Sequence, residues 1–363
     1  MTLHSGGFSA HLERIMLGEE QAGPLRIPLG AARGIYSAGL YLKNRIYDAG
    51  LATPFRSPCL VISVGGLTLG GAGKTPLAIH IARLISANKK VGILTRGYGQ
   101  QADVDVLVVS DGAKLCQPPP YSADEAYMMA DKLPGVPVVT APRRAAGATL
   151  LVNRFGVEVI VLDDGFSHRA IHRDVDIVLV DKHALDPARR KLFPLGYLRE
   201  PPENLDRATM AVVMIRYRDE ESLIGEYTEE IRRLAGKEIP VAYARGAITG
   251  FVTPSGKSVD SIPGPVLAFC GIARPGGFQR SLEERGVAVE ALLPFSDHHP
   301  YTRDDMTLIH HEALRVGAAG LVTTEKDLAR LAAFVGMDEL AGRLYIAQWD
   351  LELKRFEEAW IEP

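Results

Sequence analysis

The stretch VGGLTLGGAGKTPLAIHIARL, residues 64–84, constrains the fold of this chain more than any other feature. Five glycines separate an apolar, β-branched run from a helical pattern that begins at Lys74 and carries Pro76 in its first turn, where proline is tolerated. Glycines in such a turn let backbone N–H groups curl around phosphate oxygens, and the N-terminus of the following helix favours the same anion. The stretch therefore predicts a strand, a phosphate-binding loop and a helix, in that order.

One position departs from the G-x-x-x-x-G-K-[ST] pattern of such loops, because Thr68 stands where the first glycine is expected. That position only opens the loop, and a threonine can turn there if the neighbouring glycines adopt the unusual dihedral angles. We therefore expect a nucleotide site rather than a merely glycine-rich turn, with Lys74 reaching the β- and γ-phosphates and Thr75 coordinating Mg²⁺. The residues expected to hold the nucleotide are Gly70, Gly71, Ala72, Gly73, Lys74, Thr75 and Pro76.

Short β-branched runs alternate with helical patterns from residue 59 to about 220, and the alternation resumes near residue 240 after a charged, turn-rich segment. This pattern predicts an α/β fold of the P-loop NTPase kind, a mostly parallel sheet with helices on both faces, plus a smaller second α/β domain. A chain of 363 residues also exceeds the size at which one hydrophobic core keeps growing. We expect a helical N-terminal segment over 1–58, a nucleotide-binding domain over 59–240, and a smaller domain over 241–363 that closes over the site.

The composition argues against several classes of protein. A net charge of −3 leaves no surplus of basic residues for holding nucleic acid by bulk electrostatics. The three cysteines lie far apart and do not suggest a disulfide framework or a metal clip. We expect neither a secretion signal nor a membrane span, since no apolar run reaches about 18 residues.

Residues 27–51 form an amphipathic pattern on a helical wheel, and Lys43 interrupts its apolar side. Two interpretations are open: a helix packed on its own domain, or a helix lying in a membrane interface with tyrosines and basic residues at the head-group level. The apolar arc consists of Leu29, Ala32, Ile35, Tyr36, Gly39, Leu40, Leu42, Ile46 and Tyr47.

An apolar strand pattern ends in two acidic residues, Asp163 and Asp164. A carboxylate at the carboxyl end of a strand beside the phosphate-binding loop is where P-loop enzymes hold Mg²⁺. Adjacent strand residues point to opposite faces, so one aspartate is expected to serve the metal and the other a second role at the site. His168 and His172 follow, but no cysteine lies nearby, and the acids suit a hard cation better than zinc.

Further short motifs follow the loop in the order TRGYG (95–99), DEAYMMA (124–130), LDDGFSH (162–168), PLGYLREP (194–201), FCGIARPGGF (269–278), PFSDHH (294–299) and TTEKD (323–327). In this order they resemble the tetraacyldisaccharide 4'-kinase family over about residues 30–330. The resemblance implies transfer of the ATP γ-phosphate to the 4'-hydroxyl of a tetraacylated glucosamine disaccharide 1-phosphate in lipid A biosynthesis, with ATP and Mg²⁺ as cofactors. It also implies a peripheral protein on the cytoplasmic side of the bacterial inner membrane, where residues 27–51 rest on the bilayer. We expect a monomer with a lipid-sugar substrate and no nucleic-acid partner.

The same resemblance assigns roles to individual residues. Asp124 is the expected general base, paired with a histidine of the DHH stretch, for which His298 is favoured over His299. The family's GDEP reads ADEA here, so the acid is retained without its flanks, and Ser167 replaces a glutamine that could reach further. The catalytic set is completed by Lys74, Asp163 and Asp164, the metal ligands are Thr75, Asp163 and Glu200, and the substrate contacts are Arg144, His168 and Arg199.

Two other functions fit the phosphate-binding loop alone: a P-loop kinase with a soluble small-molecule acceptor, and a P-loop GTPase or ATPase switch. A guanine-specific switch should carry N-K-x-D, which this chain lacks, although TEKD at 324–327 is close to it. We assign TTEKD no catalytic role, since a threonine that caps a helix explains the motif.

Overall fold

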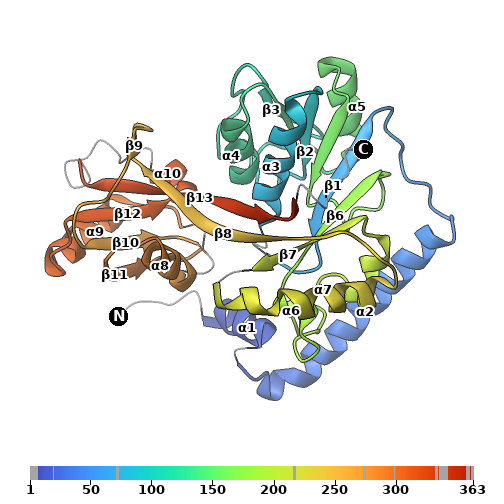
Figure 1. The fold of residues 1–363 in the computed structure, drawn as a ribbon, viewed down its shortest axis with the longest axis horizontal. Helices are drawn as coiled ribbons and strands as arrows, with labels where there is room; N and C mark the ends of the chain where they lie inside the picture. The colour runs from blue at the N-terminus through green and yellow to red at the C-terminus, as the bar shows by residue number, and fades with distance from the viewer. Residues whose placement is uncertain are drawn as a thin grey trace. The chain divides into compact units, whose positions relative to one another are not determined.

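The computed structural model describes residues 7–18, 20–70, 73–215, 218–272, 275–297, 299–331, 334, 342–356 and 360. The chain forms two compact units (Figure 1): unit 1 comprises residues 1–245 and 353–363, and unit 2 comprises residues 246–352. Unit 2 thus begins five residues later than the predicted domain over 241–363, and the chain returns to unit 1 before its end. The boundary falls inside a strand, β8 (Val241–Val252), rather than in the turn-rich segment before it.

Unit 1 contains a mostly parallel sheet with the strand order β8-β7-β6-β1-β5-β2-β4-β3, and β3 is antiparallel to β4. All residues of β2 and β5 are buried, which requires cover on both faces of the sheet. The predicted P-loop type of fold is confirmed. The strands are β1 (Leu60–Gly66), β2 (Val91–Thr95), β3 (Leu107–Asp111), β4 (Pro137–Thr140), β5 (Val159–Asp163), β6 (Val175–Val180) and β7 (Met210–Ile215).

Helices lie between these strands along the chain, and among the described residues two α-helices precede the first strand, the second of them amphipathic. That helix, α2 (Arg26–Asp48), confirms the helical pattern predicted over 27–51. The others are α1 (Gly7–Leu17), α3 (Lys74–Ser86), α4 (Asp124–Lys132), α5 (Arg144–Phe155), α6 (Lys182–Leu185) and α7 (Ile224–Ala235). Short 3₁₀ helices span Gly23–Leu25, Pro202–Arg207 and Arg218–Leu223.

Unit 2 has a smaller sheet with the strand order β11-β10-β12-β13-β8, in which β10 pairs in parallel with both β11 and β12. Parallel pairing requires crossovers, and helices supply them. The strands are β9 (Ser258–Val259), β10 (Val266–Cys270), β11 (Val289–Pro294), β12 (Gly320–Thr324) and β13 (Leu344–Lys354). The helices are α8 (Pro275–Glu284), α9 (Arg303–Arg315) and α10 (Glu325–Leu331).

The close approach of β1 to the segment after β5 makes Gly65 a position where only hydrogen fits. A Cβ at Gly65 would lie 2.4 Å from the Phe166 Cβ and 2.7 Å from its backbone nitrogen. We expect Gly65→Ala to lower the free energy of unfolding by about 1–3 kcal/mol, measured by urea denaturation. Gly34→Ala on α2, where no atom lies within 4 Å of the added carbon, is the control and should cost nothing. Equal losses in the two variants would contradict the steric argument.

Candidate active site

The structure explains why Thr68 can open the phosphate-binding loop. Thr68 is 1% exposed and forms an antiparallel bridge with Leu198, so its backbone is paired like that of a strand and suits a β-branched residue. Among the described residues of the loop, positive φ angles fall on glycines, +74° at Gly70 and +82° at Gly73. The predicted contacts of Gly71 and Ala72 lie outside the described residues.

The segment around Arg199 braces the loop from the other side of this bridge. The backbone N–H of Leu69 donates to the Tyr197 carbonyl at 2.9 Å, and that of Arg199 donates to the Leu67 carbonyl at 2.8 Å. These bonds join two motifs that lie about 130 residues apart in the sequence. The PLGYLREP motif is therefore part of the loop's own framework.

Lys74 is the first residue of α3 and lies back over the loop. Its ammonium is 3.3 Å from Asp164 Oδ1 and donates to the Gly70 carbonyl oxygen at 3.4 Å. The buried Thr75 follows it, and Pro76 stands in the same first turn. The predicted lysine and hydroxyl thus sit at a helix N-terminus behind the glycine turn, where anions bind favourably.

The two aspartates after β5 have opposite surroundings. Asp163 is 3% exposed; its Oδ2 accepts the Thr95 hydroxyl at 3.1 Å, and its Oδ1 has no hydrogen-bond partner among the described residues. Burial raises the pKa of Asp163 to about 7, and the neighbouring Asp164 adds to the effect. Burial would also raise the pKa of Asp164, but Lys74 and Arg199 outweigh it and hold that pKa below its usual range. One carboxyl is easily protonated and the other stays ionised, as in many sites that divide roles between two acids.

Thr95 is a site residue that the sequence-based prediction did not assign. It is the last residue of β2, which lies beside β5 in the sheet. A polar residue at the carboxyl end of a strand that neighbours the acidic one is the signal that points to it.

Asp163 makes the free energy of unfolding depend on pH. Its folded pKa of about 7 exceeds the unfolded value of about 3.9, so the folded chain binds an extra proton between these values. The contribution of Asp163 to the free energy of unfolding is therefore at its maximum below about pH 4, and it is lost as the pH rises through about 7. In urea unfolding without nucleotide or magnesium, we expect Asp163→Asn to remove a slope of up to about 1.4 kcal/mol per pH unit within this window. Parallel pH profiles for the two proteins would contradict the assignment.

Arg199, a predicted substrate contact, forms an ion pair inside the site. Its guanidinium binds both carboxylate oxygens of Asp164, one of them at 2.9 Å, beside Lys74. Glu200, a predicted metal ligand, is buried and accepts from Asn204 and, at 3.4 Å, from Arg207. Lys74 and Arg199 thus share the Asp164 carboxylate. If one of them stays paired with Asp164, the other can bind an anionic ligand.

Arg144 and His168, the other predicted substrate contacts, differ in charge. Arg144 is the buried first residue of α5; it donates to the Ala141 carbonyl at 2.7 Å, while its Nε has no partner among the described residues. Burial lowers the pKa of Arg144 to about 10, so it stays charged at neutral pH. Burial, followed by Arg144 and Lys43, lowers the pKa of His168 to about 4, so His168 is neutral and can only hydrogen-bond.

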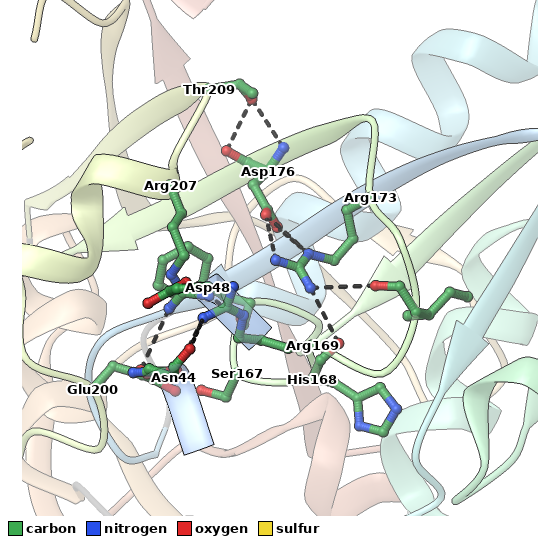
Figure 2. A network of polar contacts seen from close by, with 12 residues as sticks. Asn44, Asp48, Ser167, His168, Arg169, Arg173, Asp176, Glu200, Arg207 and Thr209 are labelled. Atoms are coloured by element: carbon green, nitrogen blue, oxygen red, sulfur yellow. Dashed lines mark hydrogen bonds and ion pairs between the residues drawn. The ribbon is translucent and has the colours of Figure 1, made fainter. Parts of the chain in front are cut away.

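The loop after Asp164 is tied to α2 through polar groups. Figure 2 shows Arg169 reaching Asn44 and Asp48, with its guanidinium 2.8 Å from the Asp48 carboxylate and 3.2 Å from the Asn44 carbonyl oxygen. Lys43 donates to the Ser167 carbonyl at 2.7 Å, which gives the lysine of the apolar arc a partner. The polar residues of α2 therefore make these contacts, because the loop offers them the Arg169 guanidinium and the Ser167 carbonyl group.

Tyr36 extends the same docking toward the ion pairs of Asp164. Its hydroxyl donates to the Arg199 carbonyl at 2.9 Å. Several apolar residues of the predicted arc remain exposed, including Ile35 at 77% and Leu42 at 61%. The arc is thus divided: Tyr36 faces the protein, and Ile35 and Leu42 face solvent.

Asp124, the predicted base, is the first residue of α4 and is partly exposed. The next residue, Glu125, lies close enough to Asp163 to help raise its pKa, so the first turn of α4 is near the acidic end of β5. The structure therefore brings Lys74, Asp163, Asp164 and the start of α4 into one region of unit 1.

The histidine stretch belongs to unit 2. His298 lies outside the described residues, so its predicted role stays a prediction. His299 is partly buried, with Nε2 3.0 Å from Asp305 Oδ2 and its ring stacked on Phe295. Across the described parts of the chain, no cluster of three or more histidine, cysteine or acidic side chains is arranged to hold a metal ion.

The comparison with known proteins identifies the family. A profile described as Tetraacyldisaccharide-1-P 4'-kinase matches residues 25–362. The tetraacyldisaccharide 4'-kinase of Anaeromyxobacter sp. (strain K) is 38% identical over 353 residues, 93% of this chain and 90% of that protein. The enzyme of the same name from Desulfatibacillum aliphaticivorans is 38% identical over 334 residues, 88% of this chain and 87% of that protein.

A solved structure agrees with these relatives. The crystal structure of LpxK from Aquifex aeolicus in complex with ATP is 29% identical, covers 92% of this chain and 96% of that chain, and superposes with a TM-score of 0.71. The sequence resemblance, the braced phosphate-binding loop and the paired aspartates all agree with these matches. This chain therefore belongs to the tetraacyldisaccharide-1-phosphate 4'-kinase family.

Proposed function

We propose that this chain transfers the γ-phosphate of ATP to the 4'-hydroxyl of a tetraacylated glucosamine disaccharide 1-phosphate. The names of its relatives support this acceptor, and the ATP complex of the Aquifex aeolicus structure supports the donor. The observation that carries the proposal is the arrangement of Lys74 and Arg199 around Asp164 beside a braced phosphate-binding loop. Phosphoryl transfer depends mainly on positioning and charge stabilisation, which such an arrangement supplies.

The donor set near Asp163 fits a magnesium ion. Asp163 has a buried oxygen with no hydrogen-bond partner among the described residues, and the buried Thr75 lies at the start of the helix that follows the loop. Oxygen ligands and substrate phosphates are what Mg²⁺ prefers, and the bound ion would neutralise charge on the transferring group. Asp163 and Thr75 are the residues that would hold it. Glu200 uses Oε2 for its contacts with Asn204 and Arg207, so it would bind the ion through its other oxygen, Oε1.

The remaining roles follow from charge and position. Lys74 forms an ion pair with Asp164. When the lysine turns from Asp164 toward ATP, its positive charge would stabilise the transferring phosphoryl group. Asp124 is the proposed general base for the acceptor hydroxyl, assisted by His298, and Arg144 supplies a buried positive charge for an anionic substrate. His168, neutral at pH 7, would donate or accept a hydrogen bond rather than attract phosphate.

A transfer assay tests the proposal directly. Purified protein with labelled ATP and magnesium should phosphorylate a detergent-solubilised tetraacyl disaccharide 1-phosphate. A soluble-acceptor kinase would leave this lipid unlabelled and modify a soluble sugar or cofactor intermediate, and a switch protein would only hydrolyse nucleotide. Absence of labelled lipid at saturating substrate would overturn the proposed acceptor.

We extend the proposal to peripheral binding at the cytoplasmic side of the inner membrane. In the described part of the chain, no helix combines the length and apolar character needed to cross a bilayer. The helix α2 contacts the rest of unit 1 through Asn44 and Asp48 and leaves Ile27, Ile35 and Leu42 exposed. An amphipathic helix with this division suits an interface with lipid.

Vesicle binding provides the measurement. Replacing Ile35 and Leu42 by glutamate should lower partitioning onto phospholipid vesicles by about tenfold or more, because each apolar side chain loses its favourable burial in lipid. Leu314→Glu on α9, a 57% exposed leucine of unit 2, is the matched control. Equal partitioning of the wild type and the double variant would show that α2 is not the membrane contact.

A further inference from the structure

The TTEKD motif, left without a catalytic role above, ends at a fully buried carboxylate of unit 2. Asp327 is 0% exposed and lies in the first turn of α10. The Thr324 hydroxyl accepts the backbone N–H of Asp327 at 3.2 Å and donates to Asp327 Oδ2 at 2.6 Å. Helix capping accounts for Thr324, but it does not account for a buried charge at Asp327.

The described contacts of this carboxylate are all with donors. Oδ1 accepts the backbone N–H of Gly271 at 3.0 Å, the Tyr301 hydroxyl at 3.1 Å and the Arg330 guanidinium at 3.3 Å. Burial raises the pKa of Tyr301, and Asp327 raises it further, so this hydroxyl keeps the proton that it donates. A carboxyl group can accept from every neighbour only when it is ionised. The site is therefore built for a charged Asp327.

Two of these donors, Gly271 and Tyr301, lie beside the histidine loop, whose described residues are Ser296, Asp297 and His299. A Cβ at Gly271 would lie 3.1 Å from Asp327 Oδ1, 3.1 Å from the His299 Cβ and 3.1 Å from the Ser296 carbonyl oxygen. The loop therefore packs directly against the glycine that Asp327 holds.

Tyr301 also packs against the loop, at His299. Its ring meets the His299 ring edge-on, with centroids 5.1 Å apart. His299 also stacks on Phe295, with ring centroids 4.7 Å apart, and its Nε2 lies 3.0 Å from Asp305 Oδ2. Asp327 thus accepts hydrogen bonds from two residues, Gly271 and Tyr301, that both lie against His299.

We infer that Asp327 is a positioning residue for the histidine loop, because its carboxylate holds the glycine and the tyrosine against which that loop packs. Asp327 is fully buried and acts through these neighbours, not on substrate. The catalytic consequence rests on the proposed function, in which His298 assists the base. The structural consequence, fixed positions of Ser296 and His299, does not depend on it.

The test combines kinetics and NMR on the full-length protein. Asp327→Ala removes all acceptors, and Asp327→Asn keeps the shape while replacing one acceptor by a donor and removing the charge opposite Arg330. We expect kcat to fall about 100-fold and about tenfold, respectively, with KM for ATP unchanged. Asp260→Asn, an exposed aspartate of unit 2, is the control and should behave as wild type. If Asp327→Ala does not fold, Asp327→Asn and Tyr301→Phe, which removes one donor, carry the test.

A double-mutant cycle separates positioning from stability. In a His298→Ala background, Asp327→Asn should cost little further turnover, because both changes act through the same loop. The His299 ring resonances, shifted by stacking on Phe295, should move toward unstacked values in the Asp327 variants and not in Asp260→Asn. Full additivity, or unchanged His299 resonances in a folded Asp327 variant, overturns the inference. If His298→Ala alone turns over normally, the histidine's proposed catalytic role fails, and the NMR result decides the positioning of the loop.

Discussion

Replacing Lys74 with alanine is expected to lower kcat by about 100- to 1,000-fold, the largest effect of any single change in the nucleotide loop. The ammonium group lies at the glycine turn, where it donates to the Gly70 carbonyl oxygen at 3.4 Å. It also lies 3.3 Å from Asp164 Oδ1, and Arg199 forms a bidentate pair with the same carboxylate. Asp164 therefore keeps a partner when the lysine is lost, and the damage should fall on catalysis rather than on folding.

The measurement is kcat and KM for ATP in the lipid phosphorylation assay, together with urea denaturation of the same proteins. Lys90→Ala, an exposed lysine of unit 1, is the matched control and should retain wild-type turnover. A loss in unfolding free energy that accounts for the lost activity would show that Lys74 serves the fold. Wild-type kcat in a folded Lys74→Ala protein would remove it from the chemistry.

Asp124→Asn is expected to lower kcat by about 100- to 10,000-fold while leaving ATP affinity nearly intact. The amide keeps the size of the side chain but cannot accept a proton from the acceptor hydroxyl. Asp124 is partly exposed at the N-terminus of α4, so its replacement creates no buried defect. The expected signature is a change in kcat with an unchanged dissociation constant for nucleotide.

Two variants on the same helix make this test specific. Asp131→Asn lies on α4 and is exposed, so it controls for the loss of one negative charge. Glu125→Gln addresses the neighbouring acid, whose charge helps raise the pKa of Asp163. If Glu125→Gln abolishes turnover and Asp124→Asn does not, the base is the second acid of the pair.

Much of unit 1 could be predicted because its signals are local. Runs of β-branched residues, the glycine turn before Lys74 and the acids at the end of an apolar strand each reflect a few neighbouring residues. The sheet then brings Thr95 and Asp163 together, because β2 and β5 are parallel neighbours and their carboxyl ends share one edge. The second unit was expected at 241–363 and forms over 246–352, since strand pairing rather than composition decides where β8 changes unit.

The sequence by itself determined the secondary-structure order, the phosphate-binding loop with Lys74, and the amphipathic character of α2, because periodicity and glycine content are properties of short segments. The tertiary structure alone decided how Thr68 is accommodated, since its bridge to Leu198 joins positions 130 residues apart. It also decided that α2 docks by Asn44 and Asp48, and that a buried Asp327 holds Gly271 and Tyr301. Burial and long-range donors set the charge of a carboxylate, and neither can be read from the residues beside it in the chain.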